Sequence, residues 1–420
     1  MNSRIIRRLF SQVVGLAFLI VTPAYAQNIV QIDTSSFTAI RIDPSNAMGG
    51  NVSDIFSGLE YIPLETTPKS TLGKVNQLGI LNGHFVVLDY DKNAIFIFED
   101  NGKFRARING KKGIGIQRFY INRWTNQIVF SNDNFQSMNY CDLDGKVVRT
   151  DRNMDLSGIP IIYLNTSFTS KDQLIGYDQY RDLDTLSIYY KPYSRSLLRF
   201  GHPIHSIGMP YTAAESKIDV LSTAVSPLKP TADDTVFLFT KPYDYLVYSI
   251  TPSSIALAYK FIFPQSFSLP DDFLVNRIYE QKRIAFVQKN KSLIFSLNNF
   301  YKLGHNLLFR ASAYTSSMED NLIYNLASGS LIAYKRILPD EMSFFLPICD
   351  KVTSNFENIG IAYSDGTYIY TSLSSLSLFN GKEEAKDKKV AYPETLKRYF
   401  NKSTSTSNPV ILRLKLKEEL

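Results

Sequence analysis

Apolar and polar positions along the chain form short alternating runs that turn residues separate. The clearest group predicts four strands, at 72–81, 85–89, 94–99 and 104–108. Asn82-Gly83 and Asn101-Gly102 fall between apolar runs. An Asn-Gly pair is a strong hairpin signal because both central residues of a type I′ turn need positive φ. The segment therefore predicts a four-stranded antiparallel unit.

The same unit recurs 43 residues further along the chain. Gly83–Phe104 aligns with Asn126–Val147, which places Gly102 on Gly145. Cys141 takes the position of Phe98, so we expect it to be a small core residue of the third strand. A period of 40 to 50 residues with strands and turn signals is typical of β-propeller blades.

Weaker copies follow, each an apolar or alternating run between polar turn residues. They predict strand pairs at 173–178 with 186–191, at 235–240 with 245–250, and at 306–313 with 321–326, and a single strand at 366–373. The count predicts an all-β fold, a six-bladed β-propeller with four-stranded antiparallel blades. Hydrophobic residues at 44% and aromatic residues at 13% supply enough apolar surface for such a core.

Within the C-terminal segment 409–417, residues 412–417 alternate strictly between apolar and charged side chains, which predicts a strand with one buried face. We expect this strand to close the ring by pairing with an early strand, Phe37–Asp43, and we expect a short helix near Pro393–Phe400. The predicted organisation is a cleaved signal peptide at 1–26, an N-terminal segment with the closing strand at 27–53, and the propeller at 54–417.

The first 26 residues have the pattern of a secretory signal. Three arginines precede a short apolar run at 13–21, and Ala24-Tyr25-Ala26 is a typical cleavage site. No later stretch is long enough for a transmembrane helix. Neither Cys141 nor Cys349 follows the signal, so we expect no N-terminal lipid anchor. These features predict a soluble protein, periplasmic or secreted after cleavage near Ala26.

The charge of the chain says little about its partners. The formal net charge is +7, and removal of the three signal arginines leaves +4. Nucleic-acid binding needs a dense basic stripe, so this small excess argues against it.

Two segments resemble a known family. The residues Asp54-Ile55-Phe56 with Tyr61-Ile62-Pro63-Leu64-Glu65-Thr66-Thr67, and the closing Asn408-Pro409-Val410, resemble the six-bladed β-propeller family of exported and lipid-anchored proteins of gut-type Gram-negative bacteria. The resemblance implies a propeller and export, and little about activity. Residues 110–120 depart from the Gly-rich pattern G-x-G-P-G-E-Y that such proteins carry.

Candidate binding residues follow from the blade geometry. The loops between second and third strands share one face with the blade connections, while the tight hairpins share the other. The loop face is the candidate ligand face, and its polar and aromatic residues suit hydroxyl binding and stacking on sugars. These candidates are Asp89, Tyr90, Asp91, Asn132, Asn134, Tyr177, Asp178, Arg181, Lys241, Tyr243 and Asp244. The alternative is that Asp and Asn only cap turns by bonding their own backbone.

Three functions remain open at this point. The preferred hypothesis is a non-enzymatic binding module of the cell envelope that recognises a glycan, peptide or partner protein. The second is a metal-dependent hydrolase or lyase that uses channel carboxylates. The third is a scaffold subunit of an envelope complex. Channel carboxylates could hold Ca²⁺, but no D-x-D-x-D-G loop occurs, and we expect no catalytic motif, metal or other cofactor.

Overall fold

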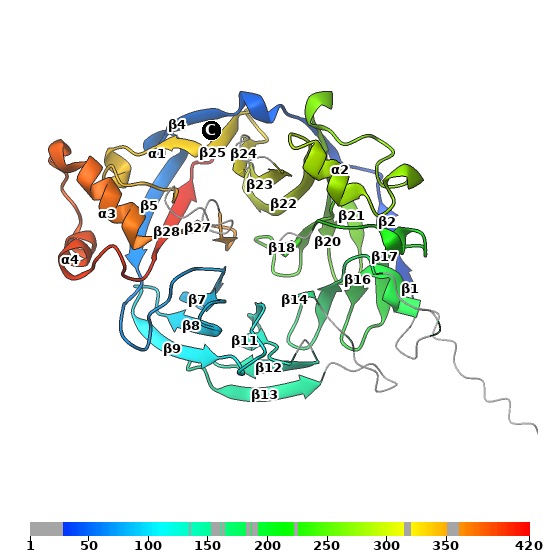
Figure 1. Ribbon diagram of the computed structural model, residues 1–420, viewed down its shortest axis with the longest axis horizontal. Coiled ribbons are helices and arrows are strands. Elements are labelled where there is room, and N and C mark those ends of the chain that lie inside the picture. Colours follow the sequence, from blue (N-terminus) through cyan, green and yellow to red (C-terminus); the bar gives the residue numbers. More distant parts are fainter. Residues whose placement is uncertain are drawn as a thin grey trace, which may run out of the picture.

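Six sheets stand side by side in a ring, and residues 77–416 run around that ring once (Figure 1). The computed structural model describes residues 28–133, 136–152, 161, 164–181, 186, 192–221, 226–314, 321–350 and 361–420. The arrangement is a six-bladed β-propeller with mainly antiparallel four-stranded blades. The predicted fold class is confirmed.

Each blade is numbered in chain order, with its strands given from the ring centre outward. Blade I contains β6 (Gln77–Leu81), β7 (His84–Asp89), β8 (Ala94–Phe98) and β9 (Phe104–Asn109). Blade II contains β10 (Phe119–Asn122), β11 (Gln127–Phe130), β12 (Ser137–Cys141) and β13 (Val147–Arg152). Blade III contains β14 (Asn165–Phe168), β15 (Leu174–Tyr177), β16 (Ser196–Phe200) and β17 (Ser206–Pro210).

The second half of the ring follows the same plan. Blade IV contains β18 (Leu228–Pro230), β19 (Phe237–Thr240), β20 (Leu246–Ile250) and β21 (Ile255–Ile262). Blade V contains β22 (Ile294–Leu303), β23 (Asn306–Ala313), β24 (Asn321–Asn325) and β25 (Leu331–Leu338). Blade VI contains β26 (Tyr363–Ser364), β27 (Ile369–Leu373), β28 (Val410–Leu416) and β5 (Phe56–Pro63). The α-helices are α1 (Val52–Ile55), α2 (Arg283–Lys289), α3 (Ser375–Glu384) and α4 (Glu394–Lys402), the last at the predicted place.

The blades hold together through separate apolar clusters between neighbours. In β7, Phe85 and Val87 pack toward blade VI, whereas Val86 and Leu88 pack toward blade II. Successive side chains of a strand point to opposite faces of its sheet, so a blade between two neighbours buries both faces. This explains why β7 is a continuous apolar run rather than an alternating one.

The turns confirm one hairpin type and correct another. Asn82 and Gly83 both have positive φ, as a type I′ turn requires. At Asn101-Gly102 only Gly102 has positive φ, and the β8–β9 register shifts at Ile97/Phe98. That turn is therefore a type I turn with a bulge at glycine. A similar register shift and a positive-φ glycine recur at Gly145, one blade later.

The ring closes through a different early strand from the one predicted. The C-terminal β28 pairs antiparallel with β5, whereas residues 38–41 of the predicted partner form β3 and pair with β21 of blade IV. The reason lies in burial. β5 buries Tyr61 and Ile62 on its two faces, but β3 buries only Ile40. An outer strand that packs between two neighbouring blades must bury side chains on both faces, as β5 does.

The segment before β5 runs along the outside of three blades. Its strands are β1 (Asn28–Val30), β2 (Ile32–Asp33), β3 (Thr38–Arg41) and β4 (Met48–Asn51). They pair parallel with β17, β21 and β25, the outermost strands of blades III, IV and V. We call residues 28–51 the N-terminal belt (Figure 1, in blue).

Blade III also differs from its prediction. The third strand is β16, and β15 pairs with β14 on one side and β16 on the other. Both edges of β15 are therefore occupied, and the predicted pairing with 186–191 is wrong. Within that range only Leu186 belongs to the described residues.

Candidate ligand channel

The inner strands of all six blades surround a channel at the ring centre. Its two ends differ. We call the end with the loops between second and third strands and the blade connections the loop end, and the other the hairpin end. The described lining comes from every blade, including Gln77, Tyr120, Thr166, Lys229, Tyr301 and Tyr363, and the cavity volume is about 210 Å³.

The predicted loop-face residues lie mostly inside the blades rather than in the channel. Only Tyr90 lines the channel among those that the structure describes, and it is exposed. Asp89 is buried, and its carboxylate accepts backbone hydrogen bonds from Gly73 at 2.8 Å and Lys92 at 3.0 Å. Asp91 is exposed near Lys74. These contacts are the turn-capping geometry of the alternative interpretation.

The remaining predicted residues have partners within the fold. Asp178 is buried and forms ion pairs with Arg199 at 2.8 Å and Arg181 at 2.9 Å. Burial raises the pKa of Asp178, and the two arginines oppose that rise. Lys241 pairs with Asp244 at 2.9 Å.

Two aromatic candidates and one amide complete the predicted set. Tyr177 is buried against Phe239, between blades III and IV. The Tyr243 hydroxyl donates to the Asp219 carbonyl at 3.0 Å. Asn132 accepts from Asn139 at 3.3 Å, and Asn134 lies outside the described residues.

An ion pair lies at the hairpin end of the channel. The Arg123 guanidinium, after β10 of blade II, contacts the Asp234 carboxylate, after β18 of blade IV. Tyr363 of blade VI completes this group. Burial raises the pKa of Tyr363, and the neighbouring Arg123 opposes the rise. Alternate blades thus send a polar side chain to the hairpin end, where Trp124 also lines the channel.

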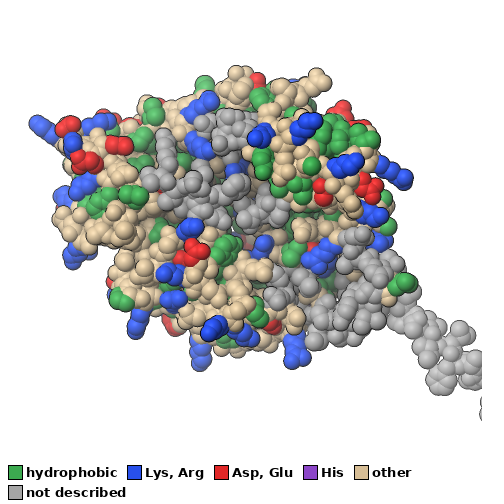
Figure 2. All heavy atoms as spheres, viewed as in Figure 1, with side chains coloured by type: hydrophobic (Ala, Val, Ile, Leu, Met, Phe, Trp, Pro, Cys, Tyr) green, Lys and Arg blue, Asp and Glu red, His purple; other side chains and the backbone are tan. Residues whose placement is uncertain are grey.

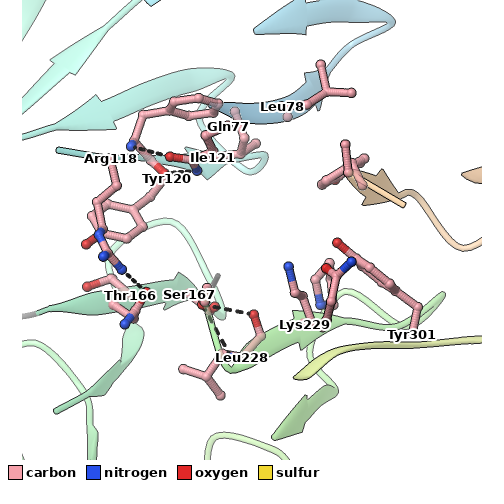
Figure 3. A pocket seen from close by; sticks show the side chains of 18 of the residues that line it. Gln77, Leu78, Arg118, Tyr120, Ile121, Thr166, Ser167, Leu228, Lys229 and Tyr301 are labelled. Carbon is pink, nitrogen blue, oxygen red and sulfur yellow. Dashed lines mark hydrogen bonds between the residues drawn. The ribbon is translucent and has the colours of Figure 1, made fainter. Parts of the chain in front are cut away.

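Further along the channel, a lysine lies against a tyrosine. Lys229 on β18 is 8% exposed, and its ammonium nitrogen lies 5.0 Å from the ring centre of Tyr301 on β22. Burial lowers the pKa of Lys229 to about 7. The Tyr301 ring is fully buried, and burial raises the pKa of its hydroxyl. Figure 3 shows both side chains directed into the same open space.

Arg118 faces this pair from the other side of the channel (Figure 3). It precedes β10 directly, and the Gln77 side chain fixes the start of that strand. The Gln77 amide donates to the Phe119 carbonyl at 2.7 Å and accepts from the Phe119 N–H at 3.0 Å. Arg118 donates to Asn165 of blade III. Within the described ranges, its buried Nε has no hydrogen-bond partner.

Tyr120, two residues further, hydrogen-bonds the Leu164 carbonyl at 3.1 Å. Burial raises the pKa of Tyr120 to about 12, so its hydroxyl stays protonated and keeps its hydrogen bond to that carbonyl. The departure of residues 110–120 from the expected Gly-rich pattern thus includes the segment that brings Arg118 and Tyr120 to the channel.

Basic side chains line the channel in excess. The described lining contains Arg118, Arg123, Lys229 and Arg310, against the single carboxylate of Asp234. On the outer face the charges are dispersed, since Figure 2 shows basic side chains spread around the rim in the coloured part of the surface. The channel lining therefore has a more concentrated excess of positive charge than the coloured surface in Figure 2.

Sequence reasoning missed Arg118, Lys229 and Tyr301. Lys229 and Tyr301 lie on inner strands, and Arg118 directly precedes one, each in a different blade. No local pattern marks a residue that faces the ring centre. The one available signal was Lys229 itself. A lysine within the short apolar strand β18 breaks the run Leu228–Pro230.

A comparison with protein families identifies the family of this chain. A model for a domain of unknown function, DUF4934, matches residues 38–415. The chain belongs to this family. No curated protein matches the sequence. Among the described residues of this DUF4934 protein, no helix is both long and apolar enough to cross a bilayer.

One solved structure shows the same fold at low identity. A protein of Bacteroides fragilis NCTC 9343, whose description suggests export, is 15% identical with a TM-score of 0.62, and the match covers 90% of this DUF4934 protein and 100% of that chain. A DUF4221 family member from Bacteroides vulgatus is 9% identical with a TM-score of 0.45, covering 86% and 97% of the two chains. The first likeness supports the propeller fold alone, and the second carries no further argument.

Proposed function

We propose that this protein is an exported binding module of the cell envelope that takes part of a ligand into its central channel. The observation that carries the proposal is the channel itself, a cavity with aromatic, amide and charged side chains from all six inner strands. Binding sites are typically concave and largely apolar, with a few polar groups that orient the ligand. The signal-like N-terminus supports export.

A glycan fits this channel better than a peptide or a folded partner. Small-molecule sites usually have volumes of about 300–1,000 Å³, and this cavity of about 210 Å³ is smaller. It suits a single sugar unit more than a stretch of polypeptide. Tyr90, Tyr120 and Trp124 offer aromatic surface along its length. The rest of a larger glycan would lie at the loop end.

The charge of the channel favours binding of this kind over metal-dependent hydrolysis. A divalent cation needs several oxygen ligands, usually carboxylates. The described lining has one carboxylate, Asp234, and Arg123 already contacts it. The other basic side chains would repel a cation. The scaffold hypothesis needs only the outer surface, and it stays a prediction.

The sole tryptophan provides the test, because Trp124 lines the channel and reports on its occupancy. The experiment titrates purified protein with oligosaccharides from envelope and host glycans and follows Trp124 emission. We expect saturable changes. Ser167→Tyr places a bulky ring in the channel and should abolish them.

The matched control is Val148→Tyr on the outermost strand of blade II, where Val148 is 49% exposed. It should leave binding unchanged. If folded Ser167→Tyr protein binds the same glycan as tightly as wild type does, the ligand site lies outside the channel and the proposal is wrong.

A further inference from the structure

Lys229 is a buried cation without a counter-charge in the described part of the fold. It is more than nine-tenths buried, and the Tyr301 ring is its one charge-stabilising contact there. A cation–π contact replaces only part of the lost hydration of an ammonium group. Within the described residues, no carboxylate lies within ion-pair distance of Lys229. This lysine therefore destabilises the unliganded protein.

The fold does not supply the missing charge from elsewhere in the channel. Asp234 is the one carboxylate of the described lining, and it contacts Arg123 at the hairpin end. The other described ionisable groups of the lining are cationic or phenolic. Burial lowers the pKa of Lys229 to about 7, which is the physical signature of an uncompensated ammonium.

Arg118 provides a second group for the same ligand. Its Nε is buried and unpartnered among the described residues, so the fold leaves part of the hydrogen-bonding capacity of this guanidinium unsatisfied. A guanidinium binds planar oxyanions through paired donors. Gln77 holds the adjacent strand, and Asn165 holds the guanidinium itself. The donor is thus fixed in place before any ligand arrives.

We propose that the channel binds an oxyanion of a compact ligand, with Lys229 and Arg118 as its recognition groups, and that the ligand is an acidic sugar. The inference rests on the proposed function, because it assumes that the channel is the ligand site. A carboxylate between the two cations would compensate the Lys229 ammonium, and the Tyr120 ring would contribute aromatic surface. A neutral sugar would leave both cations uncompensated.

Three matched sugars test the charge requirement. Isothermal titration and Trp124 emission would compare glucuronate, glucose 6-phosphate and glucose at constant ionic strength. A hydrogen bond to a charged group contributes enough to change affinity by about tenfold to a hundredfold. We expect at least one of the two anionic sugars to bind at least tenfold tighter than glucose. The preferred anion distinguishes carboxylate from phosphate recognition.

Variants then assign the site. Lys229→Gln and Arg118→Gln should each weaken binding of the anionic sugar by about tenfold or more, whereas Lys229→Arg should retain most of it. Lys415→Gln is the matched control, because Lys415 is an exposed lysine on β28. It should have no effect. Circular dichroism and melting temperature establish that each variant is folded.

The outcomes separate this inference from the proposed function. If glucose binds as tightly as the anions, and Ser167→Tyr abolishes both, the channel binds sugars but not through charge. If an anion binds and neither Ser167→Tyr nor Lys229→Gln weakens it, the site lies elsewhere and both proposals fail. If neither anion binds saturably, the acidic-sugar inference is overturned.

Discussion

Asn408 joins the two ends of the propeller chain, and its replacement by alanine should weaken ring closure. The side chain is 1% exposed and makes three hydrogen bonds to residues 65–72. Its oxygen accepts from the Leu72 N–H at 2.9 Å, and its nitrogen donates to the Glu65 carbonyl at 2.8 Å and to the Ser70 carbonyl at 2.9 Å. These bonds fix the segment after β5 to the segment before β28.

The magnitude follows from the partners that alanine leaves behind. Glu65 keeps a second donor, the Ser70 hydroxyl at 2.7 Å. The Leu72 N–H and the Ser70 carbonyl lose the Asn408 side chain. A buried polar group without its partner costs about 1–3 kcal/mol, so Asn408→Ala should lower the free energy of unfolding by about 2–5 kcal/mol. For a chain of this length that corresponds to a drop of roughly 2–6 °C in melting temperature.

Differential scanning calorimetry of the purified protein measures this change. Asn401→Ala is the matched control, because Asn401 is exposed on α4. Asn408→Asp adds a pH signature. An ionised carboxylate cannot donate to the two carbonyls, so this variant should be less stable at pH 7 than at pH 5 relative to wild type. If Asn408→Ala has the same melting temperature as the Asn401→Ala control, Asn408 does not hold the ring closed.

Three further changes test separate features. Lys229→Met should stabilise the protein by up to about 5 kcal/mol below pH 7. Between pH 7 and about 10.5 the unfolded wild type holds more protons than the folded wild type, so the stability gain measured by urea unfolding should shrink over that range. A stability gain that stays constant with pH would contradict the burial argument. Gly102→Ala should destabilise the protein by more than about 2 kcal/mol, because the φ of Gly102 is positive and a Cβ there would collide with the Pro63 carbonyl. Gly329 has positive φ but open space around it, so Gly329→Ala should lower the free energy of unfolding by only about 1 kcal/mol. Equal losses in the two variants would refute the collision. Arg123→Ala should increase acrylamide quenching of Trp124 with under about 1 kcal/mol change in stability, and unchanged quenching would show that Arg123 does not shield the hairpin end.

The sequence predicts the blades well because each hairpin carries its own signal. β7, β8 and β9 begin and end within one residue of the predicted bounds, and Cys141 is a buried residue at the end of β12 as predicted. Turn chemistry and alternation are local properties, so they can be read without the tertiary fold. Asn101-Gly102 shows the limit, since a bulged turn and a type I′ turn share the same dipeptide.

The channel and the ring closure could not be read in the same way. Lys229 and Arg118 line the same channel only because the ring brings the inner edges of blades II and IV to a common centre, and no spacing along the chain encodes that. The C-terminal strand was correctly identified, but its partner was not. Phe37–Asp43 and β5 are both short mixed runs, and only burial on two faces distinguishes them. The predicted loop residues stay candidates, most of them with structural partners already.

The pairing of β5 with β28 has a consequence for how the protein matures. A chain is synthesised from its N-terminus, yet β5 has no neighbour in its own blade until nearly the last residues are made. The belt must likewise wait for strands made well over a hundred residues later. Folding dominated by such distant pairings is slow. Newly made protein should therefore expose unpaired strand edges for longer than a fold built from local hairpins alone.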